Sequence, residues 1–209
     1  MRRIRYLIMC SLLLPPGLGV AKGLGEVEIE GLRGELLDNV RKSISLMRVT
    51  DAQRKSMSEA RLMYLLGRLP EEVDVALQPY GYYGSSVETV VGDSVNQPTV
   101  KIIVNRGEAV RVNSLDVTLD GPAEHDDAVL AVANDFKPNV GAVMDHRVYE
   151  SSKLAMQRVL LSQGYFSAEM KTHRVEVSRQ TREAHIDMEW NTGARYRFGE
   201  TTIEGSHIR

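Results

Sequence analysis

Outside its first 21 residues the sequence lacks cysteine, and it has no basic run anywhere and no apolar run of membrane-spanning length. The one cysteine among 209 residues is Cys10, which lies in a segment that we expect to be removed. A mature chain without cysteine has no disulfides and no thiolate ligands, so its stability depends on an apolar core. With 26 basic and 28 acidic residues and no basic stripe, nothing indicates a nucleic-acid partner.

The N-terminal segment has the pattern of a secretory signal peptide. Three arginines within the first five residues precede an apolar stretch at 6–20, which Pro15 and Pro16 interrupt. This stretch is shorter than the roughly 20 residues of a spanning helix, so an uncleaved membrane anchor is the weaker alternative. The small residues at 19–21 predict cleavage after Ala21. Loss of three of the 26 basic residues leaves 23 against 28 acidic residues.

Three landmarks recur in one order along the chain. An apolar residue, an acid and glycine occur at 29–31, 119–121 and 203–205, with glycines 90 and 84 residues apart. Gly81-Tyr82-Tyr83 recurs 83 residues later as Gly164-Tyr165-Phe166. The pattern Asn-x-Gly at 105–107 recurs 86 residues later at 191–193. An internal repeat of roughly 85 residues follows from this spacing.

Periodicity predicts the order strand, helix, helix, strand, strand for the first unit. Alternation favours strands at 26–30, 86–91 and 99–104. Leu36, Leu37, Val40 and Ile44 form the stripe of a first helix. A capping box at 56–59 begins a second helix, which we expect to break near Gly67 and restart at Pro70.

The second unit repeats this order. We expect a strand at 110–119 with a slip at Asn113-Ser114, a short helix face at 129–136, and a closing hairpin of 168–178 and 184–190. Asp145 is the predicted cap of a long helix. The buried stripe of that helix is expected to contain Val148, Ser152, Ala155, Met156, Val159 and Leu160. Trp190 should be at least partly buried at the end of the last strand.

The predicted fold class is therefore α+β, with a three-stranded sheet packed against helices in each unit. The expected divisions are a signal peptide at 1–21, units at 25–106 and 107–194, and the first strand of a third unit within 195–209. Arg195 and Arg197 flank the entry to the third unit, and we expect them to be solvated. The alternative is that they contact phospholipid headgroups or a partner.

The order of these elements resembles the POTRA domain, which occurs in tandem in BamA, TamA and their relatives. The segment from Leu69-Pro70-Glu71 to Gly81-Tyr82-Tyr83 is similar to the first POTRA domain of TamA-like proteins. The Gly164-Tyr165-Phe166 turn, the run at 193–199 and the signal peptide fit the same family. Family members continue through a third POTRA domain into an outer-membrane barrel, for which this sequence has no room, so we expect a fragment or a truncated product.

The resemblance implies a periplasmic protein that binds polypeptides at the outer membrane, during assembly of outer-membrane proteins and autotransporters. The implied partners are unfolded outer-membrane proteins and a TamB-like periplasmic protein. An open sheet edge can add a client strand through backbone hydrogen bonds, which tolerates many sequences. The candidate edges are the strands after each aromatic turn, with residues Val87, Glu88, Thr89, Val90, Lys171, Thr172 and His173. Proline at Glu88 or Thr172 would test an edge if that residue's N–H faces outward.

The aromatic turns have two interpretations. Gly81, Tyr82, Tyr83, Gly164, Tyr165 and Phe166 are candidate structural turns, in which glycine permits the change of direction and the rings fill the core. Alternatively, the rings form part of a peptide-binding edge.

Other classes of function have little support. The five histidines show no metal-ligand spacing, and no nucleophile elbow, phosphate loop or dinucleotide motif occurs. We therefore expect no catalytic, cofactor or metal site. The alternatives are a POTRA-type interaction module of an inner-membrane cell-division protein and a small periplasmic enzyme. The first requires a retained N-terminal anchor, and the second requires a convergent polar cleft.

The signal peptide can be tested directly. Protein recovered from the periplasm should begin at Lys22, because cleavage follows Ala21. N-terminal sequencing measures this, and periplasmic material that begins at Met1 would contradict it.

Overall fold

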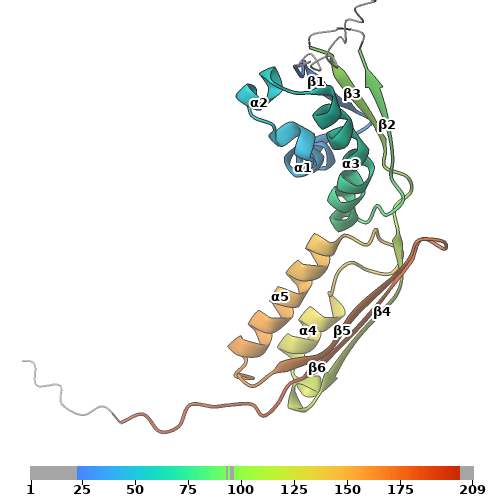
Figure 1. The fold of residues 1–209 in the computed structure, drawn as a ribbon. Helices are drawn as coiled ribbons and strands as arrows, with labels where there is room; N and C mark the ends of the chain where they lie inside the picture. Colours follow the sequence, from blue (N-terminus) through green and yellow to red (C-terminus); the bar gives the residue numbers. More distant parts are fainter. Residues whose placement is uncertain (1–22, 93, 95–96, 203–209) are drawn as a thin grey trace, which may run out of the picture.

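The chain forms two three-stranded sheets, one after the other, each with its helices on one side (Figure 1). The computed structural model describes residues 23–92, 94 and 97–202. The predicted signal peptide lies outside these residues and stays a prediction. The predicted α+β class is confirmed. Among the described residues, no helix combines the length and apolar character needed to span a membrane.

The first unit has strand order β1-β3-β2, with β1 parallel and β2 antiparallel to the central strand β3. Its elements are β1 (Val27–Glu30), α1 (Gly34–Ser43), α2 (Asp51–Lys55), α3 (Glu59–Leu77), β2 (Ser86–Val91) and β3 (Val100–Asn105). Alternate residues of β3 are buried beneath the helices, and the stripe of α1 reaches the same core through Val40 and Ile44. The short helix α2, which begins at a capping box of Thr50 and Gln53, was not predicted.

The expected break in the second helix is wrong. α3 runs without interruption from Glu59 to Leu77, with Pro70 inside it and Ser58, rather than Ser56, as its cap. Proline at this position removes one backbone donor. Seven buried apolar residues lie on both sides of Pro70 and pack into one core, which holds the two halves of the helix in line.

The second unit has the same topology, with strand order β4-β6-β5. Its elements are β4 (Arg111–Asp120), α4 (Asp127–Asn134), α5 (His146–Ser162), β5 (Glu169–Ser178) and β6 (Glu183–Asn191). The predicted slip in the first strand is confirmed, because the register between β4 and β6 shifts between Val112 and Ser114. The predicted cap of the long helix is also confirmed, since Asp145 Oδ1 accepts a hydrogen bond of 2.9 Å from the N–H of Arg147.

The stripe predicted for α5 is partly wrong. Tyr149, Met156 and Leu160 are its buried residues, whereas Val148 and Ala155 are exposed. The buried face is thus rotated toward Tyr149, whose ring packs edge-on against Phe136 at 5.9 Å between centroids. Apolar spacing alone did not distinguish the two faces, because both carry small or apolar side chains.

The first strand of a third unit does not form in the described residues. Residues 192–202 have no strand assignment, and 203–209 lie outside the described part of the chain. A strand needs a partner to complete its backbone hydrogen bonds, and no strand of either sheet pairs with residues 192–202.

Trp190 tests the core of the second unit. Its side chain is 3% exposed, and its indole N–H has no hydrogen-bond partner among the described residues. Trp190→Ala should therefore lower the free energy of unfolding by ~3–5 kcal/mol, because it leaves a large cavity. Trp190→Phe should cost less than Trp190→Ala, because the phenyl ring leaves a smaller cavity.

Urea unfolding followed by circular dichroism measures both variants. Phe198→Ala is the control, since Phe198 is fully exposed and should change stability by less than about 0.5 kcal/mol. A similarly small effect for Trp190→Ala would show that the indole does not support the core.

Candidate polypeptide-binding edges

Both strands predicted as candidate edges lie at the edge of a sheet. β2 and β5 each pair with one strand only, β3 and β6 respectively. β1 and β4 occupy the opposite edges, and the sequence interpretation did not consider them. Strand order depends on how the two helices cross over the sheet, which the pattern of one strand does not reveal.

The hydrogen bonds of β3 show which backbone groups of β2 face outward. Gly92 and Thr99 are opposite each other, and the N–H of Gly92 donates to the carbonyl of Thr99 at 2.9 Å. In an antiparallel pair, hydrogen-bonded and non-hydrogen-bonded positions alternate. Val91, Thr89 and Val87 therefore point their N–H and C=O groups away from β3.

A second hydrogen bond supports the same alternation from the other side of β3. The N–H of Val100, which is opposite Val91, donates to the carbonyl of Glu26 beside β1 at 2.8 Å. Val100 is therefore engaged with β1 and not with β2. It follows that Glu88 and Val90 bond inward to β3, so proline at Glu88 would break the sheet instead of testing its edge.

The side chains of β2 divide between two faces of the sheet. Val87, Thr89 and Val91 share a face with the buried residues of β3, on the side that the helices cover. Glu88 and Val90 lie on the helix-free face, opposite Ile103 and Lys101 respectively. Val90 is 47% exposed, which leaves apolar surface next to the edge.

The two charged residues on the helix-free face of β2 and β3, Lys101 and Glu88, differ in their partners. Lys101 Nζ lies 2.8 Å from Glu30 Oε1 and 3.9 Å from Glu28 Oε2, and the hydrogen bond to Glu30 raises the pKa of Lys101. Glu88 has no ion pair within the described ranges of the chain. The carboxylate of Glu88 therefore faces solvent beside the open edge.

The β5 edge carries features that protect an edge from pairing. Its register with β6 shifts between Met170 and Thr172, so Lys171 forms a bulge. Lys171 pairs with Glu169, and Arg174 pairs with Glu176 at 3.3 Å. Bulges and exposed charges, lysine above all, are common devices against edge-to-edge association. His173 is exposed and Thr172 is half-buried within this protected strand.

The two remaining edges are shorter or partly covered. β1 has four residues. The start of β4 pairs with the loop before α5, where Val112 donates to Ala142 at 2.9 Å and accepts from Gly141 at 2.7 Å. β2, with six residues, no bulge, no proline and no lysine, is the least protected of the two strands that we predicted as edges.

The first aromatic turn joins the two units. Gly81 has φ +84°, and a Cβ at this position would lie 2.7 Å from the carbonyl oxygen of Met144, so only glycine fits. The carbonyl of Gly81 accepts a hydrogen bond of 2.8 Å from Val110. Tyr83 packs against the core of the second unit, and its hydroxyl is hydrogen bonded to Nε2 of His146.

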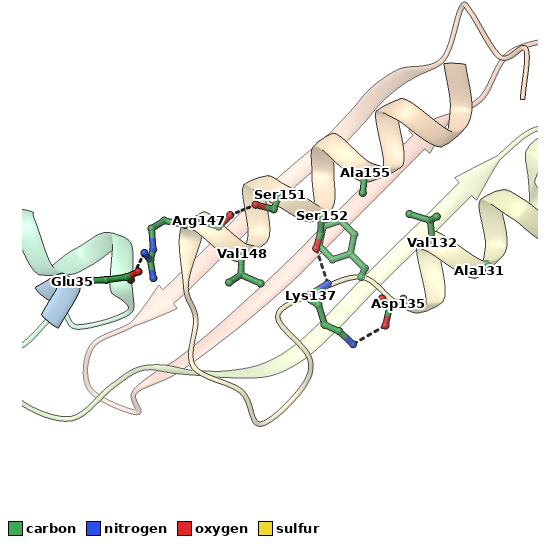
Figure 2. A pocket seen from close by; sticks show the side chains of 11 residues that line it. Glu35, Ala131, Val132, Asp135, Lys137, Arg147, Val148, Ser151, Ser152 and Ala155 are labelled. Carbon is green, nitrogen blue, oxygen red and sulfur yellow. Dashed lines mark hydrogen bonds and ion pairs between the residues drawn. The ribbon is translucent and has the colours of Figure 1, made fainter. Parts of the chain in front are cut away.

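Arg147 strengthens this junction from the start of α5. Its guanidinium lies 2.7 Å from Glu35 Oε2 in the first unit (Figure 2). It also lies 2.7 Å from Asp145 Oδ2, and the hydrogen bonds to Asp145 and Glu35 raise the pKa of Arg147. The same group stacks on the ring of Tyr80 at 4.1 Å. These contacts hold the sheets of the two units in a defined relation.

The second aromatic turn repeats the backbone of the first but not its surroundings. The carbonyl of Gly164 accepts from the N–H of Tyr196 at 2.8 Å, as Gly81 does from Val110. Tyr165 is buried, whereas Phe166 is 62% exposed and contacts the ring of Tyr196 at 5.7 Å. Core filling therefore accounts for Tyr165 and not for Phe166, which is the counterpart of Tyr83.

Arg195 is exposed, as predicted, but it also has partners within the chain. Its guanidinium lies 3.3 Å from Asp126 Oδ2 and donates to the carbonyl of Gln163 at 2.8 Å. Asp126 also caps α4, so this contact ties the chain after β6 to the start of that helix. Arg197 is exposed.

A groove of about 700 Å³ separates α4 from α5, and Figure 2 shows its lining. Val132, Phe136 and the exposed Val148 and Ala155 give it an apolar wall. Its polar groups already have partners: Ser152 Oγ accepts from the N–H of Lys137 at 3.0 Å, and the ammonium of Lys137 pairs with Asp135 at 2.9 Å. In the described part of the chain, no three His, Cys, Asp or Glu residues are grouped to hold a metal ion.

Comparison with known proteins identifies the first unit. Residues 26–106 match the family model for POTRA domain 1 of TamA. The chain thus contains a TamA-like POTRA region, and its two units share one topology. POTRA domains act as protein-interaction modules, which directs attention to the open edges of this region.

Solved structures of POTRA regions match this chain at low identity and low TM-score. The chain is 16% identical to POTRA domains 3–5 of Haemophilus influenzae BamA, over 88% of this chain and 73% of that one, with a TM-score of 0.40. It is 18% identical to POTRA domains 1–2 of Anabaena Omp85, over 84% and 96%, with a TM-score of 0.36. It is 15% identical to Haemophilus ducreyi BamA lacking POTRA domains 1–3, over 81% of this chain and 29% of that one, with a TM-score of 0.38.

The junction should lose stability in acid through His146. Burial lowers the pKa of His146, against a smaller opposing effect of Asp145 and Glu150. The unfolded chain therefore binds the proton first as the pH falls through about 6.5, and the folded state is destabilised. The free energy of unfolding should fall more for the wild type than for His146→Gln between about pH 7.5 and about pH 5.

Urea titrations at several pH values measure this difference. His125→Gln is the matched control, because His125 is exposed and lies away from the junction. Equal pH dependence of the wild type and His146→Gln would show that this imidazole is not responsible.

Proposed function

We propose that this region binds extended polypeptides at the β2 edge in the periplasm, as part of outer-membrane protein and autotransporter assembly. The single observation that carries the proposal is the open backbone of Val87, Thr89 and Val91 on an unprotected strand of a TamA-type POTRA domain. Each of these residues offers one donor and one acceptor to an added strand. The partners would be unfolded outer-membrane proteins or a TamB-like periplasmic protein.

Backbone pairing suits a factor that handles many clients. Main-chain groups are the same in every polypeptide, so an edge can accept different sequences without a specific pocket. The match of residues 26–106 to TamA supports this role over that of a cell-division module. The proposal requires no catalytic residue and no cofactor.

Proline at a residue whose N–H points away from β3 tests the edge. Thr89→Pro removes an outward N–H and should weaken peptide binding about tenfold, because a hydrogen bond is lost and the ring obstructs the added strand. Proline is tolerated on edge strands, so the fold should survive. Thr89→Ala keeps the N–H and should bind like the wild type.

Fluorescence anisotropy with labelled peptides from outer-membrane β-strands measures affinity, and circular dichroism measures folding. Glu88→Pro is the matched control, because it removes an inward N–H and should destabilise the sheet. Unchanged affinity of folded Thr89→Pro would remove β2 as the binding edge, and Thr172→Pro and His173→Pro would then test β5.

A further inference from the structure

We infer that Glu88 selects, among the strands that β2 accepts, those with a basic side chain directly opposite it on the helix-free face. This inference rests on the proposed binding at β2. It adds a residue that determines specificity and a chemical class of partner: an alternating strand that is apolar toward the helices and carries lysine or arginine on its other face.

The alternation of hydrogen bonds places Glu88 at a favourable position. Val87, Thr89 and Val91 would form the hydrogen-bonded pairs with an added antiparallel strand, because their backbone groups point outward. Glu88 and Val90 would then lie in non-hydrogen-bonded pairs, in which Cα atoms are about 4.5 Å apart, compared with about 5.5 Å in the other pairs. The side chain opposite Glu88 is therefore among the nearest that the partner presents.

The neighbours of Glu88 leave its charge available. Ile103, directly across on β3, is apolar and offers no partner. Lys101, the nearest base in that row of β3, is engaged by Glu28 and Glu30 of β1. Among the described residues the carboxylate of Glu88 makes no hydrogen bond or ion pair, so a cation from an added strand meets no competitor.

The face of β2 that the helices cover favours a different kind of side chain in the partner strand. Val87 packs against the core beneath the helices, and Val91 is 41% exposed at the end of the strand. Partner residues opposite Val87, Thr89 and Val91 would extend this surface, so apolar side chains fit there. The best partner strand therefore has apolar side chains on the face that the helices cover. On its other face it has a basic side chain at the position opposite Glu88.

Three synthetic peptides of about eight residues test the selection. They alternate valine with threonine and differ only in one central threonine, which is replaced by lysine, glutamine or glutamate. Wild-type protein should bind the lysine peptide about threefold more tightly than the glutamine peptide, as expected for one cross-strand ion pair. The glutamate peptide should bind about threefold more weakly than the glutamine peptide.

Variants of Glu88 should change the order of affinities. Glu88→Gln should remove the preference, and Glu88→Lys should reverse it, so that the glutamate peptide binds most tightly. Glu176→Lys is the matched control, because it changes the net charge equally from an exposed position on the other sheet. It should leave the preference intact, and high salt should reduce the preference in the wild type.

The outcomes separate this inference from the proposed function. If Glu88→Lys still prefers the lysine peptide while Thr89→Pro abolishes binding of all three, the edge binds but Glu88 does not select. If Glu176→Lys also reverses the preference, the overall charge of the region selects, and the inference is wrong. If Thr89→Pro changes nothing, the β2 edge itself is wrong, and the role of Glu88 fails with it.

Discussion

The central strand β3 divides its backbone hydrogen bonds between two neighbours, and this division determines what the first unit can offer to a partner. Alternate residues of β3 bond to β1, as Val100 does to Glu26, and the residues between them bond to β2. β2 therefore uses every second residue for the sheet and leaves the others outward. The register with β3 separately places Glu88 and Val90 on the helix-free face, opposite Ile103 and Lys101.

The sequence predicted the helices and strands better than the way in which they pack together. Period-two runs predicted the strands, and even the bulge at Asn113 was visible as a slip in alternation. Two features were not predictable from local pattern. Pro70 favours a helix start locally, but tertiary packing keeps it inside α3. Val148 and Ala155 fit a buried stripe by spacing, but Tyr149 needs the larger interior space beside Phe136.

The candidate edges illustrate the same limit. The strands after the aromatic turns could be chosen from the sequence. Which residues of β2 point their N–H groups away from β3 could not be predicted in this way. Side-chain alternation shows which face a residue occupies, whereas the direction of its N–H depends on where the partner strand lies. Glu88 therefore seemed a reasonable position for proline, although its N–H bonds inside the sheet. The bulge at Lys171, which protects β5, likewise exists only in relation to β6.

The two aromatic turns share a backbone conformation but differ in what their rings contact. Gly81 and Gly164 both adopt positive φ and accept a hydrogen bond from the chain that leaves the unit. The ring of Tyr83 is covered by the second unit and bonded to His146, so the first turn fixes the orientation of the β2 edge relative to the second sheet. Phe166 has no hydroxyl and no such cover within the described part of the chain.

Energy terms explain why side chains matter at an edge that binds through the backbone. Three outward residues supply at most six hydrogen bonds, each with a net value of about 0.5–1.5 kcal/mol. Ordering about six residues of an unfolded client costs about 1–2 kcal/mol each, so the two terms are of similar size. A cross-strand pair adds only about 0.2–1 kcal/mol, but this small term acts on a balance close to zero. Under the proposed function, weak backbone affinity would let the β2 edge release its clients, and one unpaired carboxylate would be enough to bias which of them it holds.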